Sequence, residues 1–218
     1  MTKIIAINGS PRRNWNTAKL LQAALDGAAS CGAETKLVHL YSLNYKGCVS
    51  CFACKNKKLE HGHCALKDDL SPLLEEIRDV DAIIFGSPIY YMNMSSGMLA
   101  FLERLFFSNY IYSNEIRTVF PKKIPSAFFY TMNMTEREFV HYRMKRVLYI
   151  YESSAERHLQ VPPKMLYGYD TVQFSDYDKF ESSIFDPAEK YANEKKNFPR
   201  LLEQAFEIGK ELVTGSPE

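Results

Sequence analysis

Four polar side chains near the N-terminus could bind a phosphate. An apolar run over residues 4–7 gives way to a polar segment before a helical pattern begins, and this segment contains Ser10, Arg12, Asn16 and Thr17. A loop between a strand and a helix directs unpaired N–H groups and the positive end of the helix dipole at one point. The loop lacks the glycines of the dinucleotide and nucleoside-triphosphate motifs. It therefore predicts a site for one terminal phosphate, as on FMN. The alternative is an ordinary helix capped by Asn16 or Thr17.

Four cysteines form a second candidate site. Cys48, Cys51 and Cys54 have the spacing by which a loop wraps a [4Fe–4S] cluster, and Cys64 follows after a gap of nine residues as a fourth thiolate. Two histidines lie in the gap, so a zinc site built from two cysteines with a histidine or Cys64 is an alternative. A third interpretation is reduced, metal-free thiols that form a disulfide only on oxidation. The spacing leaves all three open.

The polar segment after the first predicted strand is here called the phosphate loop. Two later segments should meet it at one edge of a sheet, because ligands of open α/β sheets bind beyond the carboxyl ends of the strands. One is the predicted loop 86–94, which offers apolar, aromatic and amide groups: Ile89, Tyr90, Tyr91, Asn93 and Met94. The other is residues 131–133. Isoalloxazine presents an apolar face and a polar rim, which such loops suit. The alternative is that these side chains only pack the loops.

The elements that would position these residues alternate between strand and helix. The pattern predicts strands at 4–7, 34–40, 80–85, 124–130 and 165–172, and helices at 17–29, 68–79, 95–107, 135–157 and 199–213. This alternation favours an α/β fold with a parallel sheet covered on both faces. We expect a single domain over residues 1–218, with a cysteine-rich loop at 47–64 and an irregular surface excursion at 173–198.

Composition narrows the class of partner. The 218 residues carry a formal net charge of +1, so no overall field favours nucleic acid or an anionic membrane. The apolar fraction of 46% is ordinary for a globular protein, and neither a signal-peptide core nor a membrane span is evident. We therefore expect a cytoplasmic protein that binds neither nucleic acid nor membranes.

Several strings of residues resemble the flavodoxin-like NAD(P)H-dependent FMN reductases, especially the branch that includes the iron–sulfur flavoproteins. The strings are NGSPR at 8–12, NTAKL at 16–20, GCVSCFAC at 47–54, FGSPIY at 85–90 and FLER at 101–104. They span roughly residues 1–133 in the expected order. The resemblance implies a flavodoxin-like, doubly wound, five-stranded parallel sheet with helices on both faces, tightly bound FMN, and a homodimer or homotetramer.

The resemblance also assigns roles by position. It implies that Ser10, Arg12, Asn16 and Thr17 hold the phosphate, that Pro88, Ile89, Tyr90, Asn93 and Met94 line the flavin ring, and that Thr131 and Asn133 lie at its rim. No catalytic side chain is expected, because the flavin carries the chemistry while the protein positions it.

Three functions are consistent with these residues. The first is an FMN-dependent oxidoreductase that passes electrons from NADH or NADPH to a small-molecule or protein acceptor. The second is an iron–sulfur flavoprotein that acts as an electron-transfer carrier, for which the cysteine loop is the distinguishing feature. The third is a flavin-free interaction module, which is disfavoured because the phosphate loop keeps all its donors.

Overall fold

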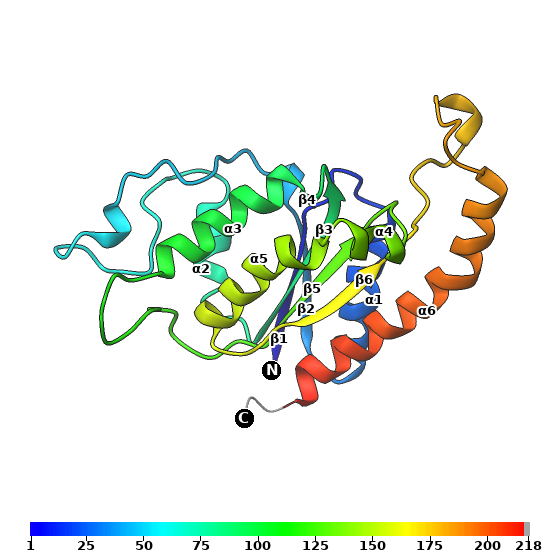
Figure 1. Ribbon diagram of the computed structural model, residues 1–218. Coiled ribbons are helices and arrows are strands. Elements are labelled where there is room, and N and C mark those ends of the chain that lie inside the picture. Colours follow the sequence, from blue (N-terminus) through cyan, green and yellow to red (C-terminus); the bar gives the residue numbers. More distant parts are fainter. Residues whose placement is uncertain (216–218) are drawn as a thin grey trace.

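The computed structural model describes residues 1–215, which form one parallel sheet with helices on both sides (Figure 1). The main strands run in the order β2-β1-β3-β5-β6. Their bounds are β1 (Lys3–Asn8), β2 (Glu34–His39), β3 (Ala82–Tyr90), β5 (Ser126–Thr131) and β6 (Lys164–Gly168). All neighbours in this order pair in parallel, while the short β4 (Asn93–Met94) pairs antiparallel with the end of β3. The predicted fold class, a flavodoxin-like doubly wound sheet, is confirmed.

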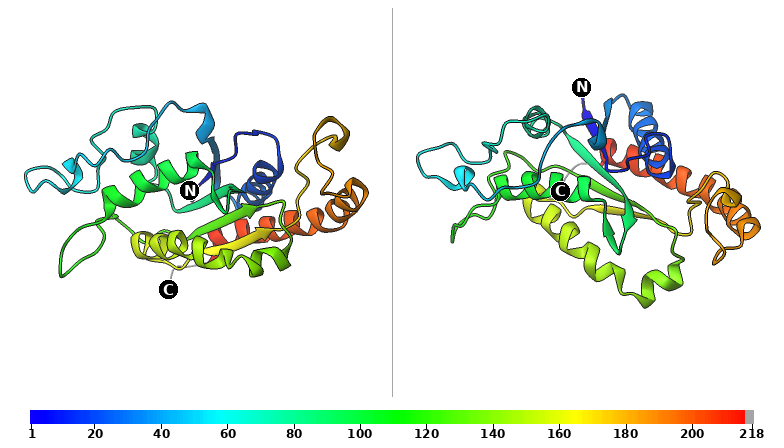
Figure 2. Two further views of the ribbon diagram at one scale, coloured as in Figure 1. Left: turned by 45° about the horizontal axis from the view of Figure 1, so that its top comes forward. Right: turned by 90° about the horizontal axis from the view of Figure 1, so that it is seen from above.

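Two layers of helices cover the sheet (Figure 2). One face is covered by α1 (Asn16–Ser30) and α6 (Pro187–Thr214), and the other by α2 (Ser71–Glu76), α3 (Ser96–Asn109), α4 (Glu136–His141) and α5 (Met144–Leu159). Alternation along β1 supplies both cores: Ile5 and Ile7 pack toward α3, whereas Ile4 and Ala6 pack toward α1. No helix within residues 1–215 has the length and apolar character needed to cross a membrane.

The helices α1 and α6 cross at very short range. A Cβ added at Gly27 would lie 2.0 Å from the carbonyl oxygen of Phe206, and one at Gly209 would lie 1.8 Å from that of Ala24. Each helix thus presents a glycine where the backbone of the other passes. The crossing joins residues near the N-terminus to residues near the end of the chain.

Some predicted boundaries were wrong. The single helix expected at 135–157 is two helices, because Arg143 adopts a left-handed conformation, with φ of 53°, that ends one and precedes the next. The helix expected at 68–79 is shorter, at Ser71–Glu76. The predicted loop 86–94 contains the end of β3 and a hairpin to β4. Tyr91 and Met92 form the turn of this hairpin, with φ values of 45° and 62°.

The structure contradicts the second half of the irregular excursion predicted at 173–198, because this half is helical. A short 3₁₀ turn (Tyr177–Lys179) interrupts the first half, and α6 begins at Pro187, where the Asp186 side chain caps the helix. Pro199 lies inside α6 rather than at its start. The helix continues through it because Phe198 and Ala205 anchor the flanking turns in the core. Residues 216–218 of the predicted domain lie outside the described part of the chain.

Candidate functional site

The loops after β1, β3 and β5 meet at one edge of the sheet, as predicted. They enclose a cavity of about 100 Å³, here called the inner cavity. The side chains predicted for the site that line it are Ser10, Arg12, Asn16, Thr17, Pro88, Ile89, Tyr90, Thr131 and Asn133. They come together because the carboxyl ends of parallel strands share an edge.

The N-terminus of α1 faces the inner cavity without a side-chain cap. The N-cap residue is Trp15, whose side chain accepts no hydrogen bond from the helix, so the alternative of a helix capped by Asn16 or Thr17 was wrong. Both residues instead lie in the first turn and are buried. Thr17 Oγ1 lies 2.8 Å from Thr131 Oγ1, which ties α1 to the end of β5. An uncapped, buried helix start attracts an anion.

Carbonyl groups that follow β6 bind the side-chain donors of the phosphate loop. Arg12 Nη1 donates to the carbonyl oxygen of Gln173 at 2.6 Å, and the guanidinium stacks 4.7 Å from the Trp15 ring centroid. Trp15 Nε1 and Asn16 Nδ2 both donate to the carbonyl oxygen of Val172, at 3.1 and 2.9 Å. Sequence reasoning missed residues 171–173 as cavity lining, because it extended the last strand to residue 172, whereas β6 ends at Gly168.

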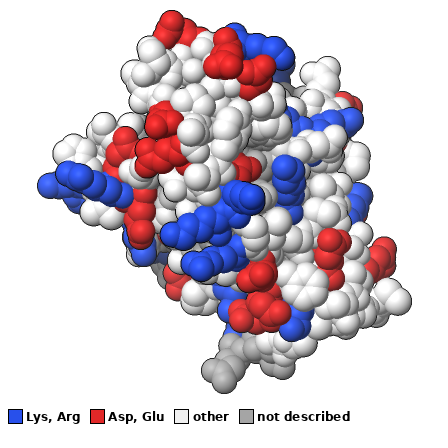
Figure 3. All heavy atoms as spheres, turned by 90° about the vertical axis from the view of Figure 1, so that its right-hand side faces the viewer, with Lys and Arg blue, Asp and Glu red and all other residues white. Residues whose placement is uncertain are grey.

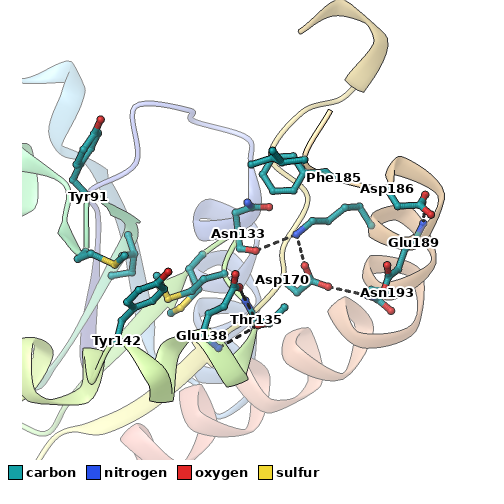
Figure 4. Close-up of a pocket in the computed structure, with 16 residues that line it drawn as sticks. Tyr91, Asn133, Thr135, Glu138, Tyr142, Asp170, Phe185, Asp186, Glu189 and Asn193 are labelled. Carbon is teal, nitrogen blue, oxygen red and sulfur yellow. Dashed lines mark hydrogen bonds and ion pairs between the residues drawn. The ribbon is translucent and has the colours of Figure 1, made fainter. Parts of the chain in front are cut away.

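A larger space, the outer cavity, adjoins the inner one (Figure 4). Its volume is about 630 Å³, and the two cavities share Ile89, Met132 and Asn133. This volume lies in the range of about 300–1,000 Å³ typical of small-molecule sites. Asn133 Oδ1 is buried there and accepts no hydrogen bond from residues 1–215. An oxygen in that state is suited to accept a hydrogen bond from a ligand.

The helix α6 supplies one wall of the outer cavity, which sequence reasoning did not predict. Lys190 is buried; its Nζ donates to the Asn133 carbonyl oxygen at 3.0 Å and pairs with Asp170. Asn193 Nδ2 donates to the other oxygen of that carboxylate at 2.8 Å (Figure 4). The sequence does contain an indication of this wall: Asp186, Lys190 and Asn193 have helical spacing, although they fall in the segment predicted to be irregular.

Three residues predicted to contact the flavin ring lie elsewhere or at the margin. Tyr91 lines the mouth of the outer cavity, but its side chain is fully exposed at the hairpin tip and points away from the other labelled residues in Figure 4. Asn93 and Met94 line neither cavity. The Asn93 side chain reaches the Tyr151 hydroxyl at 3.3 Å, and Met94 is buried in the core.

The four cysteines of the 47–64 loop converge, and Cys64 joins the other three across a gap of nine residues. Cys48, Cys51, Cys54 and Cys64 all line one small cavity of about 20 Å³. Arg104, from α3, is also part of this lining and is 1% exposed. This small space, lined by the four cysteines and Arg104, is here called the cysteine cavity.

Arg104 gives the cysteine cavity a buried positive charge. Its Nη1 pairs with Asp68 at 2.5 Å and its Nη2 donates to the Leu66 carbonyl oxygen at 3.0 Å, while Nε has no partner within residues 1–215. Burial opposes the charge, but the hydrogen bonds with Asp68 and Cys64 outweigh it and raise the pKa of Arg104. The guanidinium is thus held charged beside the thiols.

Neither histidine of the cysteine-rich loop lines the cysteine cavity. His63 instead pairs with Glu75, at 2.7 Å from Nδ1, and His61 has a buried Nε2 without a partner in the described residues. Within residues 1–215 no three side chains of the His, Cys, Asp or Glu type are placed to hold a metal ion. In this structure the four thiols are therefore not placed as a ligand set for zinc or for an iron–sulfur cluster, and no histidine of the described residues lies beside them.

Comparison with known proteins agrees with this geometry. An iron-sulfur flavoprotein of Archaeoglobus fulgidus is 36% identical over 103 residues, which are 47% of this chain and 45% of the relative. An iron-sulfur flavoprotein of Methanocaldococcus jannaschii is 35% identical over 102 residues, covering 47% and 51%. The chain thus matches about half the length of these curated relatives.

Solved structures share the fold over nearly the whole chain. The NAD(P)H:quinone oxidoreductase from Methanothermobacter marburgensis superposes with a TM-score of 0.69 at 15% identity, covering 99% of this chain and 98% of the other. The model of the family described as NADPH-dependent FMN reductase matches residues 2–161, which include the loops after β1, β3 and β5. The chain therefore belongs to the NADPH-dependent FMN reductase family.

Proposed function

We propose that the chain is an FMN-dependent oxidoreductase that transfers electrons from NADH or NADPH to a small-molecule or protein acceptor. One observation carries the proposal: the uncapped, buried start of α1 opens into an inner cavity that continues into a ligand-sized outer cavity. A phosphate needs the first and a ring system needs the second. Membership of the FMN reductase family supports the same cofactor.

The side chains that would hold FMN all line the inner cavity, and Ile89 and Asn133 line the outer cavity as well. Ser10, Arg12, Asn16 and Thr17 would bind the phosphate, together with the first N–H groups of α1. Pro88, Ile89 and Tyr90 would contact the ring, and Thr131 and Asn133 would lie at its rim. Bound FMN supplies hydride acceptance and donation, while these residues orient it and exclude water.

The wider setting is part of the proposal. We expect a homodimer or homotetramer in the cytoplasm, with NAD(P)H and the electron acceptor as its partners and no role for nucleic acid or membranes. Some side chains that line the outer cavity are exposed, among them Tyr91 and Ile184, so a neighbouring subunit would help to close it.

The cofactor carried by freshly purified protein tests the proposal. We expect flavin absorption bands to accompany the protein and chromatography of the released cofactor to yield FMN, because one phosphate loop is present and no second motif is available for an adenylate. Recovery of FAD, or failure of the apoprotein to bind added FMN, would contradict it. Oxidation of NADH or NADPH by the loaded protein, with a quinone as acceptor, then tests the activity.

The second candidate, an iron–sulfur electron carrier, is favoured by the convergence of four cysteines on one cavity beside Arg104. The curated relatives that match this chain carry the name iron-sulfur flavoprotein. The 20 Å³ cavity is too small for a [4Fe–4S] cluster as it stands, so the exposed loop would have to open around one.

Anaerobic reconstitution with iron and sulfide separates the two candidates. Protein prepared in air should contain FMN and little iron, because an exposed cysteine loop does not protect a cluster from oxidation. If about four irons bind per chain under anaerobic conditions and Cys51→Ser abolishes them, the electron-carrier function gains support. If none binds, the thiols are structural or redox-sensing and the FMN reductase function stands alone.

A further inference from the structure

We infer that the outer cavity selects its electron acceptor by charge, taking a flat ring that is uncharged or cationic and rejecting one that carries an anionic group. The inference rests on the proposed function and adds a substrate class to it. Its basis is the wall that α6 and the segment before it contribute. This wall lies beyond residue 161, where the family match ends, whereas the acidic residue Glu138 comes from α4, within the match.

The charged side chains that line the outer cavity are mostly acidic. They comprise four carboxylates, Glu138, Asp170, Asp186 and Glu189, and one ammonium group, Lys190. Lys190 and Asp170 pair directly and cancel each other's charge. Three carboxylates therefore remain without a compensating cation in the lining.

The partners of these three carboxylates are neutral. Glu138 accepts hydrogen bonds from the backbone N–H of Thr135 at 2.7 Å and from its hydroxyl at 2.9 Å. Asp186 accepts from the backbone N–H groups of Ala188 and Glu189, at 2.9 and 3.2 Å. The Glu189 carboxylate makes no ion pair within residues 1–215. The charge at the wall is therefore not neutralised.

The charge is local to the cavity. On the face seen in Figure 3, acidic and basic residues lie in small separate groups and neither sign covers the face. The net charge of the chain is only +1. Glu138, Asp186 and Glu189 are solvent-exposed, so ions screen their field within about 8 Å, the Debye length at physiological ionic strength, and the acidic wall acts on a ligand that enters the cavity and little on one that approaches from afar.

The remaining lining suits a flat ring. Met134, Tyr142, Ile184 and Phe185 offer apolar and aromatic surface. The dihydronicotinamide ring is itself uncharged, so the wall does not oppose its entry. An acceptor with a sulfonate or carboxylate on its ring would bring that anion against the wall.

A double variant removes the charge without removing the shape. In Asp186→Asn with Glu189→Gln, asparagine caps α6 as well as aspartate does. The control is Glu203→Gln, which removes one negative charge, half the change in the double variant, from an exposed position on the same helix outside the cavity lining. Acceptors of equal ring size are 1,2-naphthoquinone and its 4-sulfonate, each reduced by two electrons and two protons that come from NAD(P)H and water.

The measured quantity is the ratio of kcat/KM for the neutral quinone to that for the sulfonate, because the sulfonate also alters reactivity. We expect this ratio to fall severalfold in the double variant at low salt and to remain unchanged in Glu203→Gln, because the removed carboxylates are solvent-exposed and partly screened. A second arm needs neither turnover nor a flavin signal: the Kd of naphthalene-2-sulfonate and of 2-naphthol, measured by calorimetry on the protein as purified. The sulfonate alone should bind several-fold more tightly to the double variant.

Unchanged ratios in both arms, or an equal shift in Glu203→Gln, would overturn charge selection while leaving the proposed function intact. Failure of the proposed function has a different signature. The wild-type protein would then bind no FMN, or would bind FMN and oxidise neither NADH nor NADPH with any acceptor, while the ligand-binding arm still reports on the wall.

Discussion

Arg12 is the one cation among the described side chains that line the inner cavity. Its guanidinium bonds to the Gln173 carbonyl oxygen and stacks on Trp15, so it is already oriented at the cavity rim. Its neighbour Arg13 instead reaches Ser42, on the other side of the loop. The two arginines therefore form a natural pair for testing where the phosphate lies.

We predict that Arg12→Ala weakens the binding of FMN but not that of riboflavin, which lacks the phosphate. A charge-assisted hydrogen bond contributes about 1.5–3 kcal/mol, so the Kd of FMN should rise roughly tenfold to a hundredfold. Titration of the apoprotein with each flavin measures this. Arg13→Ala should leave both affinities unchanged, and an equal loss for both flavins in Arg12→Ala would place Arg12 away from the phosphate.

His158 makes the fold sensitive to acid. It is buried and stacks on Phe106 with ring centroids 5.4 Å apart. Burial, helped by the positive charges of Arg157 and Lys55, lowers the pKa of His158 from 6.5 to about 4. Between these values the unfolded chain binds a proton that the folded chain does not, so the free energy of unfolding decreases as pH falls from about 6.5 to 4.

We therefore predict that His158→Phe flattens the acid limb of the stability curve. Between pH 6.5 and 4, His158 should lower the free energy of unfolding of the wild type by at most about 3 kcal/mol, and the variant should lack this decrease. Urea denaturation at a series of pH values measures both. His141→Gln, at an exposed position on α4, serves as the control and should keep the wild-type slope. A wild-type slope in His158→Phe would show that other groups dominate.

At the scale of elements, the crossing of α1 and α6 depends on two glycines. Alanine is normally about 1 kcal/mol better than glycine inside a helix. Here its Cβ would meet the opposing backbone at 1.8–2.0 Å, so the helices would have to separate. Overpacking of this kind costs typically 1–3 kcal/mol or more.

We predict that Gly209→Ala lowers the free energy of unfolding by at least about 2 kcal/mol, in spite of its better helix propensity. Gly97→Ala in α3 is the matched control, because the nearest atoms there belong to the movable Tyr41 ring. Its effect should be small. If both variants gained stability equally in denaturant titrations, the close crossing would not be a constraint.

The tip of the β3–β4 hairpin has an unfavourable backbone conformation. Tyr91 and Met92 both have positive φ, a conformation that asparagine and glycine adopt far more readily in two-residue hairpins. We predict that Tyr91→Asn with Met92→Gly raises the free energy of unfolding by about 1 kcal/mol or more. A melting temperature at or below that of the wild type would contradict this.

At the scale of the whole molecule, an apolar groove of about 360 Å³ lies between α3 and α5. Phe107, Tyr110 and Ile150 are among its lining residues, and Ile150 is 61% exposed. We expect the FMN-loaded chain to sediment as a dimer or larger at micromolar concentration, and Ile150→Glu to shift it toward the monomer. A strictly monomeric profile with FMN retained would contradict the expectation.

The sequence predicted the sheet and the inner cavity because those features depend on local patterns. The apolar runs around Ile5 and Ile84 mark strands, and polar residues that follow parallel strands meet at one edge. The break at Arg143 and the continuation of α6 through Pro199 were not predictable, since tertiary packing decides both. The same holds for Lys190, whose role depends on a contact with Asn133, 57 residues away.

The crossing of α1 and α6 also bears on how the chain folds during synthesis. The outer face of α1 has its partner in residues 187–214, which leave the ribosome after every strand of the sheet. Until α6 emerges, the small apolar side chains around Gly27 stay uncovered, and the wall of the outer cavity does not exist. A nascent chain therefore has neither a complete second layer nor a complete site before α6 emerges, and the apolar surface exposed in that interval invites chaperones.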